Sequence, residues 1–231
     1  MHISFILVDS KVPENIGASA RAIKTMGFRR LVLVRPCEYS SGPARWLAHG
    51  AADILDNAEV YDSLKEATAE MDIIISTTAR YRSTKGEYTD IRDLGSLLQK
   101  KYTDNTNIAL VFGSEESGLS NDDMSLCDIT STISMVAPYP SLNLSQAVMI
   151  FAYTLNDIQT NKKEEAEKLP GEHSLALLKS KAELLLAGTD ISQNKALKGR
   201  IMERLSLAAG TDIKLFHSIA NALISKYEKE H

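Results

Sequence analysis

The sequence predicts an α/β domain with a mostly parallel sheet, followed by a small all-helical extension. Over the first 158 residues, five short runs rich in apolar and β-branched residues alternate with helical stretches. Four of these runs are almost continuously apolar, as expected for strands that are covered on both faces. Beyond residue 170 no further run of this kind occurs.

The expected elements follow the chain in a regular order. Strands are predicted over residues 3–8, 30–34, 72–76, 108–112 and 129–136. Helices are predicted to begin near Ile16, Ser63, Asp93 and Leu144, and Ser120 is placed to cap a short helix that two aspartates open. Because the first three helices each separate two strands, parallel pairing is favoured.

The last third of the chain has a different pattern. Residues 159–170 are polar and charged and end in Pro170-Gly171, which is typical of a linker. Apolar residues then recur at helical spacing in three segments, separated near Gly188 and Gly210. We therefore predict one domain over residues 1–158, and a linker with a helical extension over residues 159–231.

The composition excludes several classes of protein. Of the 231 residues, 44% are apolar and 24% are charged, which is typical of a soluble globular chain. No apolar run approaches the roughly 18 residues of a membrane helix, and the N-terminus lacks the basic start of a secretory signal. Cys37 and Cys127 are too few for a disulfide framework, and the histidines lack metal-ligand spacing. We expect a reduced cytoplasmic protein with no membrane partner and no metal.

The net charge of -4 argues at first against a nucleic-acid partner, but its distribution weakens that argument. Residues 1–158 carry 14 Lys and Arg against 20 Asp and Glu, a net charge of -6, whereas the remainder carries 12 against 10, a net charge of +2. The basic residues of the first part cluster beside the loops described next. Binding of RNA through local patches is therefore compatible with the overall charge.

The first informative loop follows the opening strand and leads into a helix. Asn15 lies at its start, and Gly17 allows another backbone or a ligand to approach closely. Arg21 and Lys24 follow at helical spacing and could face one anionic partner. An ordinary amphipathic helix with a solvated basic face explains the same residues.

The second loop, Gly113 to Ser120, follows a buried strand. Its two glycines and its small residues allow backbone N–H groups to approach a ligand. It is neither a P-loop nor a dinucleotide fingerprint, because the required glycine and lysine positions are missing. A simple N-capped helix start is compatible with the same residues.

The third loop is fixed by Pro138 and Pro140 and precedes an apolar helix. Ser141 and Asn143 lie directly before that helix, where such residues often act as N-caps. The segment contains more hydrogen-bonding groups than one cap requires, which indicates a site.

Together the three loops resemble the three motifs of the SpoU branch of the SPOUT RNA 2′-O-ribose methyltransferases. The first matches Asn-x-Gly-x-x-x-Arg from Asn15 to Arg21, and the second matches Gly-x-Glu-x-x-Gly-Leu from Gly113 to Leu119. The third matches Ser-Leu-Asn-Leu-Ser-x-Ala over residues 141–147. The segment before the third motif departs from the usual Ile-Pro-Met-x-Gly form, which favours the TrmJ-type branch.

The resemblance implies a SPOUT fold with a trefoil knot at the carboxyl end of the α/β domain, and a homodimer with the site near the interface. It implies S-adenosylmethionine (SAM) as methyl donor and a ribose 2′-hydroxyl of RNA as acceptor. The TrmJ-type branch favours tRNA, with a cytidine or uridine of the anticodon loop as target. Carried over onto this chain, the cofactor pocket includes Thr77, Thr78, Ala79, Gly113, Glu115, Ile133, Pro140, Ser141 and Leu142.

The resemblance also suggests roles in catalysis. Arg21 matches the arginine that the family assigns to the reacting hydroxyl, and because a guanidinium stays protonated we expect it to clamp the target phosphate. Asn15, Ser141 and Asn143 are expected to orient the loops and the substrate, and Glu115 to order the loop backbone. The residues expected to contact RNA are Arg21, Lys24, Arg80, Arg82 and Lys85.

Three alternatives stay open at this stage. The chain could methylate ribosomal RNA, or it could be a non-catalytic homologue that only binds RNA. Intact Asn15, Arg21, Glu115 and Asn143 argue against lost catalysis. A generic α/β nucleotide-binding enzyme is disfavoured because its phosphate-binding fingerprints are missing.

Overall fold

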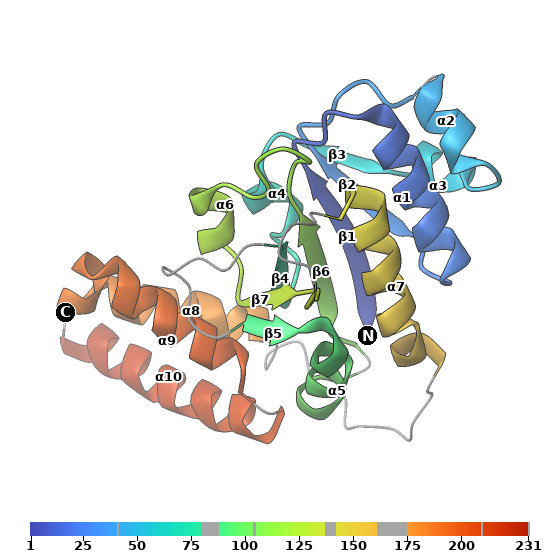
Figure 1. Cartoon of the computed structure of the whole chain (residues 1–231). Helices are drawn as coiled ribbons and strands as arrows, with labels where there is room; N and C mark the ends of the chain where they lie inside the picture. Colours follow the sequence, from blue (N-terminus) through green and yellow to red (C-terminus); the bar gives the residue numbers. More distant parts are fainter. Residues whose placement is uncertain are drawn as a thin grey trace.

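A parallel β-sheet forms the centre of the molecule in the computed structural model (Figure 1). The structure describes residues 1–40, 42–79, 88–103, 105–136, 142–160, 175–208 and 210–230. In this part of the chain the sheet has seven strands in the order β3-β2-β1-β6-β4-β7-β5, and all neighbouring strands are parallel. The strands are β1 (His2–Val8), β2 (Arg30–Val34), β3 (Glu59–Tyr61), β4 (Ile73–Thr78), β5 (Tyr88–Asp90), β6 (Asn107–Phe112) and β7 (Ile129–Thr132).

Helices cover both faces of this sheet. One face is covered by α1 (Pro13–Thr25), α2 (Pro43–Ala48), α3 (Ala52–Asp56), α5 (Ile91–Lys101) and α7 (Leu144–Thr160). The other face carries α4 (Leu64–Ala67) and α6 (Asn121–Ser125). The predicted α/β class with a parallel sheet is therefore confirmed.

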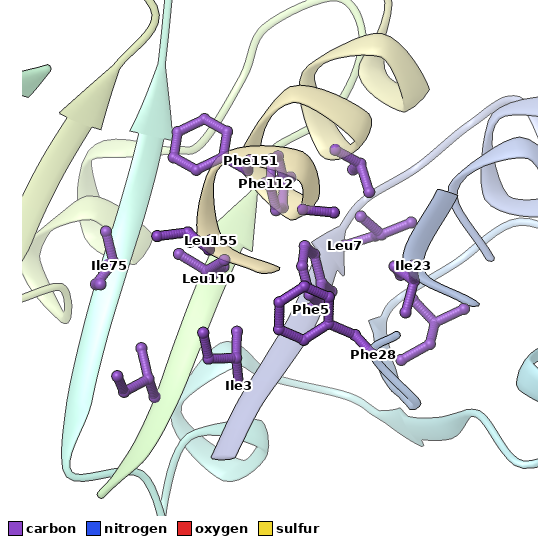
Figure 2. Close-up of a cluster of buried hydrophobic side chains, with 14 of the residues drawn as sticks. Ile3, Phe5, Leu7, Ile23, Phe28, Ile75, Leu110, Phe112, Phe151 and Leu155 are labelled. Carbon is purple, nitrogen blue, oxygen red and sulfur yellow. The ribbon is translucent and has the colours of Figure 1, made fainter. Parts of the chain in front are cut away.

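The strand β1 shows why the sheet must be covered on both sides. Phe5 points into the larger core, where its ring contacts Phe28 edge-on and lies parallel to Phe112 at centroid distances of 5.1 and 6.2 Å (Figure 2). Phe151 of α7 meets Phe112 edge-on at 5.4 Å and so joins α7 to the same core. The alternate residue, Ile6, is fully buried in the second core on the opposite face. This arrangement explains the nearly continuous apolar runs of the sequence.

The structure differs from the sequence prediction mainly in short elements. Strands β3 and β5 were not expected, because three-residue, partly exposed edge strands leave no apolar run in the sequence. Helices α2 and α3 are also short and were not expected. The strand predicted over residues 129–136 ends at Thr132, because the chain leaves the sheet there. Helix α1 begins earlier than expected, at Pro13, a residue well suited to the first helical turn.

The helical extension consists of α8 (Leu175–Ala187), a short 3₁₀ helix (Asp190–Gln193), α9 (Lys195–Ser206) and α10 (Gly210–Glu230), and lies beside the β5 edge of the sheet (Figure 1). A buried polar cluster joins it to the sheet. The Asp128 carboxylate accepts hydrogen bonds from Lys179 Nζ of α8 at 2.7 Å and from Ser206 Oγ of α9 at 2.8 Å. The Tyr102 hydroxyl donates to the Ser206 carbonyl, and burial, followed by the nearby Asp128 charge, raises the pKa of Tyr102.

The predicted trefoil knot stays a prediction, because the connection from β7 to α7 includes residues 137–141, which lie outside the described residues. Of the expected linker, residues 159–170, the first two still belong to α7, which ends at Thr160, and residues 161–170 lie outside the described residues. In the described ranges, every helix is either too short or too polar to cross a bilayer.

Candidate active site

A pocket opens at the carboxyl edge of the sheet, where the segments after β4, β6 and β7 converge. Carboxyl edges of parallel sheets are the usual place for ligands in open α/β folds. Lining residues that were predicted to hold the cofactor are Thr77, Thr78, Ala79, Gly113, Glu115, Ile133 and Leu142. The other two predicted residues, Pro140 and Ser141, lie outside the described residues. The apolar wall is completed by Phe112, Leu119, Met124, Met135, Leu144, Ala147 and Phe151.

The 113–120 loop folds back on itself so closely that Gly113 admits no side chain. A Cβ at this position would lie 2.1 Å from the carbonyl carbon of Gly118 and 2.2 Å from the nitrogen of Leu119. Gly118 has a φ of 70°, in the left-handed region that glycine tolerates. Both glycines of the predicted motif are therefore required by the backbone path of the loop.

Glu115 is the centre of a hydrogen-bond network that joins this loop to the first one. Its Oε1 accepts from Ser10 Oγ and from Asn15 Nδ2, both at 2.9 Å, and its Oε2 accepts from the backbone N–H of Lys11 at 3.1 Å. Burial opposes the ionisation of this carboxyl, but the hydrogen bonds from Asn15, Lys11 and Ser10 outweigh burial and lower its pKa. Glu115 is therefore an anion whose two oxygens are already bonded.

Asn15 extends the network to the third loop. It is buried, and its Oδ1 accepts a hydrogen bond of 2.8 Å from Asn143 Nδ2, while its own Nδ2 donates to Glu115. Asn143 Oδ1 in turn accepts from the backbone N–H of Ser145 at 2.9 Å and from Ser145 Oγ at 2.7 Å. One polar chain thus links residues from all three predicted motifs.

Gly17 serves the packing of helices. A Cβ on Gly17 would lie 1.9 Å from the carbonyl oxygen of Ala44 in α2, so the glycine allows the two helices to approach. Of the two partners that the sequence left open, a backbone or a ligand, the structure places a backbone there.

The basic residues of α1 lie apart from this network. The Arg21 side chain is exposed and does not line the pocket, and no hydrogen bond or ion pair joins it to another described residue. Lys24 Nζ forms an ion pair with Asp53 at 2.6 Å and donates to the Gly50 carbonyl at 2.8 Å. The other residues expected to contact RNA, Arg80, Arg82 and Lys85, lie outside the described residues.

Sequence reasoning missed Ser10, which is fully buried and donates directly to Glu115. Its signal in the sequence is weak: a small polar residue two positions after a buried strand, at the edge where ligands bind. As for metals, the described ranges contain no group of three or more His, Cys, Asp or Glu that could hold an ion.

Comparison with known protein families decides the class of this site. A model of the SpoU rRNA Methylase family matches residues 2–153, which carry the sheet and all three loops. The chain belongs to this family. A second model, for the C-terminal domain of the tRNA/rRNA methyltransferase LasT, matches residues 172–227 in the helical extension. The predicted SpoU membership, and with it a methyltransferase enzyme, is confirmed.

Individual relatives agree with this assignment. The chain is 39% identical over 220 residues to an uncharacterized tRNA/rRNA methyltransferase LasT of Escherichia coli K12, covering 95% of this chain and 96% of the relative. It is 40% identical over 152 residues to the tRNA (cytidine/uridine-2′-O-)-methyltransferase TrmJ of Salmonella typhimurium, covering 66% of this chain and 62% of that protein. The solved structure of TrmJ from Z. mobilis ZM4 shares the fold over 96% of this chain and 99% of its own, with a TM-score of 0.72 and 24% identity.

Proposed function

We propose that this protein transfers the methyl group of SAM to a ribose 2′-hydroxyl of RNA, with tRNA as the favoured substrate. The observation that carries the proposal is the joining of the three motif loops around one pocket, through hydrogen bonds of 2.8 to 2.9 Å from Asn143 to Asn15 and from Asn15 to Glu115. A loop arrangement held this firmly is suited to fixing two reactants against each other.

The chemistry of the pocket fits SAM. Its wall combines the apolar side chains of Ile133, Leu142 and Phe151 with the hydroxyls of Thr77 and Thr78. This mixture matches a ligand with an aromatic base, a sugar and an amino-acid chain that carries a sulfonium group. When bound, SAM supplies an already activated, electrophilic methyl group, so the reaction needs no metal for activation.

The protein's own residues then have distinct tasks. We assign Arg21 to the phosphate next to the target ribose, where its charge also stabilises the developing alkoxide. We assign Glu115 to ordering the 113–120 loop and not to accepting a proton as a base, because its oxygens already accept hydrogen bonds and its pKa is lowered. Asn15 uses both ends of its amide to brace the loops, so its role is positional. We assign a phosphate oxygen or water as the acceptor of the proton that the 2′-hydroxyl loses.

We further propose a homodimer. Arg21 is exposed and does not line the pocket of its own chain, which is in accord with a site completed near a subunit interface. The segment with Arg80, Arg82 and Lys85 follows directly on Thr77 to Ala79 of the pocket, which supports its proposed contact with RNA.

The division into a methyltransferase domain over residues 1–158 and a helical extension over residues 159–231 belongs to the same proposal. The limits of the two family matches, residue 153 and residue 172, support it. A cytoplasmic location is proposed with it, because a sequence with only two cysteines is typical of a protein in a reducing compartment.

The choice of tRNA rests on the relative that is named as a tRNA (cytidine/uridine-2′-O-)-methyltransferase. The proposed target in the anticodon loop rests on the resemblance of the three motifs to the TrmJ-type branch. Methylation of ribosomal RNA is the second candidate, favoured by the description of the matching family.

The test is a map of 2′-O-methylation across tRNA and rRNA in a strain that lacks the gene, complemented by the wild type or by Arg21→Ala. A mark in the anticodon loop that is lost and returns only with the wild type supports the proposal. Loss confined to rRNA supports the second candidate. Unchanged maps of both RNAs reject methylation of either and leave a non-catalytic RNA-binding protein.

A further inference from the structure

Two residues outside the three motifs have an unusual backbone. Asp9 and Arg35 have φ values of 52° and 48°, and they are the two non-glycine residues of the described chain in the left-handed region. They follow directly on Val8 and Val34, the last paired residues of β1 and β2. A residue with a side chain adopts this backbone conformation only where surrounding contacts impose it, and such residues cluster at functional sites.

The two residues are also bonded to each other. Arg35 Nε donates to Asp9 Oδ1 at 3.0 Å and Arg35 Nη2 donates to Asp9 Oδ2 at 2.8 Å, a bidentate pair that fixes distance and orientation. Arg35 Nη1 donates to the carbonyl oxygen of Asp62 at 3.2 Å, and its Nη2 lies 3.6 Å from Asp123 Oδ2 of α6. The hydrogen bonds from Arg35 lower the pKa of Asp9, so the pair is ionised at neutral pH.

The residues that follow Asp9 connect the pair to Glu115. The turn at Asp9 directs the next two residues toward the pocket, where Ser10 Oγ and the Lys11 N–H donate to the Glu115 carboxylate at 2.9 and 3.1 Å. The Ser10 carbonyl is fixed as well, because it accepts a hydrogen bond of 3.0 Å from the backbone N–H of Cys37, two residues after Arg35. Both strands therefore turn together and present Ser10 to the 113–120 loop.

Arg35 connects the pair to the far end of the same loop. Asp123, which Arg35 contacts, accepts a hydrogen bond from Ser120 Oγ at 2.7 Å, and its own N–H donates back to Ser120 Oγ at 3.0 Å. Ser120 is the last residue of the 113–120 loop and the N-cap of α6. The loop is thus held at Glu115 by residues that follow Asp9, and at its end by the residue that Arg35 contacts.

We propose that Asp9 and Arg35 form a positioning pair that holds the 113–120 loop in the conformation that binds SAM. Neither side chain lines the pocket, so the pair acts through Ser10 and Asp123 and is not catalytic. The inference rests on the proposed function, because it assigns SAM to this pocket.

The protein contains a matched control for this pair. Arg30 and Glu59 form a second bidentate pair, with distances of 2.9 and 3.1 Å, and their exposed fractions of 40% and 41% compare with 38% and 37% for Arg35 and Asp9. Arg30, however, is the first residue of β2, at the opposite edge of the sheet from the pocket. Its loss removes a similar ion pair without touching the loop.

The experiment measures SAM affinity by titration calorimetry and the melting temperature of the full chain. We expect Arg35→Gln to weaken SAM binding at least about tenfold, as outer contacts that orient a binding group commonly do. Asp9→Gly is expected to weaken it similarly, although glycine tolerates the left-handed backbone, because the pair is lost. Arg35→Lys keeps the positive charge but cannot form the bidentate hydrogen bonds of a guanidinium group, so we expect an intermediate SAM affinity. Arg30→Gln should leave SAM affinity unchanged.

The outcomes separate a positioning role from a general stabilising role. Unchanged SAM affinity in both Arg35→Gln and Asp9→Gly overturns the inference, as does an equal loss of affinity in Arg30→Gln. If Arg35→Gln unfolds, full wild-type affinity in folded Arg35→Lys and Asp9→Gly overturns it equally. If the wild-type protein binds no SAM, both the proposed function and this inference are wrong. If the wild-type protein binds SAM and the variants bind it with the same affinity, only the inference is wrong.

Discussion

Replacing Lys179 by methionine tests how firmly the helical extension is held on the sheet. The substitution keeps an unbranched apolar stem but removes the ammonium group that lies 2.7 Å from Asp128 Oδ2, in a pair with exposed fractions of 16% and 6%. Breaking a buried ion pair costs roughly 3–5 kcal/mol, because one charge is left without its partner. The carboxylate retains the Ile74 N–H at 2.9 Å and Ser206 Oγ at 2.8 Å, which places the loss near the lower limit, about 3 kcal/mol.

For a protein of this size, a loss of about 3 kcal/mol in the free energy of unfolding lowers the melting temperature by roughly 6–12 °C. Thermal and urea unfolding of the full chain measure it. The control is Arg45→Gln, which removes a pair with Asp56 of 2.6 Å that is 41% and 54% exposed. Such surface pairs contribute only about 0–1 kcal/mol. If Lys179→Met costs no more than Arg45→Gln, the reasoning about the buried pair is wrong.

Three further predictions concern the site. Gly113→Ala should weaken SAM binding about 100-fold or more, because the new Cβ would fall within 2.2 Å of backbone atoms of Gly118 and Leu119. Titration calorimetry measures the affinity, and a wild-type affinity in this variant would contradict the prediction. Arg21→Ala should lower kcat by about 10²–10³-fold and leave SAM affinity unchanged, because Arg21 is assigned to the RNA substrate. Single-turnover kinetics measure the rate of methyl transfer, and a normal rate in the variant would show that Arg21 has no part in the mechanism. The lowered pKa of Glu115 means that its hydrogen bonds stabilise the site above the ordinary glutamate range and are lost only as the pH falls through the lowered value. SAM affinity should therefore persist to about pH 4.3, and a decline that already begins near pH 6 would show that another group controls binding.

The central strands could be predicted from the sequence because they are buried on both faces. The run from Ile3 to Val8, for example, has almost no polar residue, and its members are buried in two cores. The edge strand β3, Glu59–Tyr61, has no such signal because it is three residues long and partly exposed. Its existence depends on pairing with β2, a tertiary contact that local sequence does not encode.

The site was predictable to the extent that its residues lie in recognisable loops. Asn15, Glu115 and Asn143 were expected together and are hydrogen-bonded in series. The contacts that fix these loops were not predictable, because the left-handed backbone of Asp9 and Arg35 leaves no mark in the local sequence. The exposure of Arg21 was predictable as well, because the helical spacing of the apolar residues around it already indicated a solvated basic face, and Arg21 is exposed in the structure.

The hydrogen bonds that join the three loops all run in one direction. Ser145 Oγ donates to Asn143, Asn143 Nδ2 donates to Asn15, and Asn15 Nδ2 donates to Glu115. Aligned hydrogen bonds polarise one another by roughly 10–30% per bond, so each bond strengthens the next. The negative charge on Glu115 is therefore stabilised by an ordered chain of dipoles that reaches the first turn of α7. Because an amide has one donating and one accepting end, aspartate at position 15 would place carboxylate against carboxylate, and the chain would break at its centre.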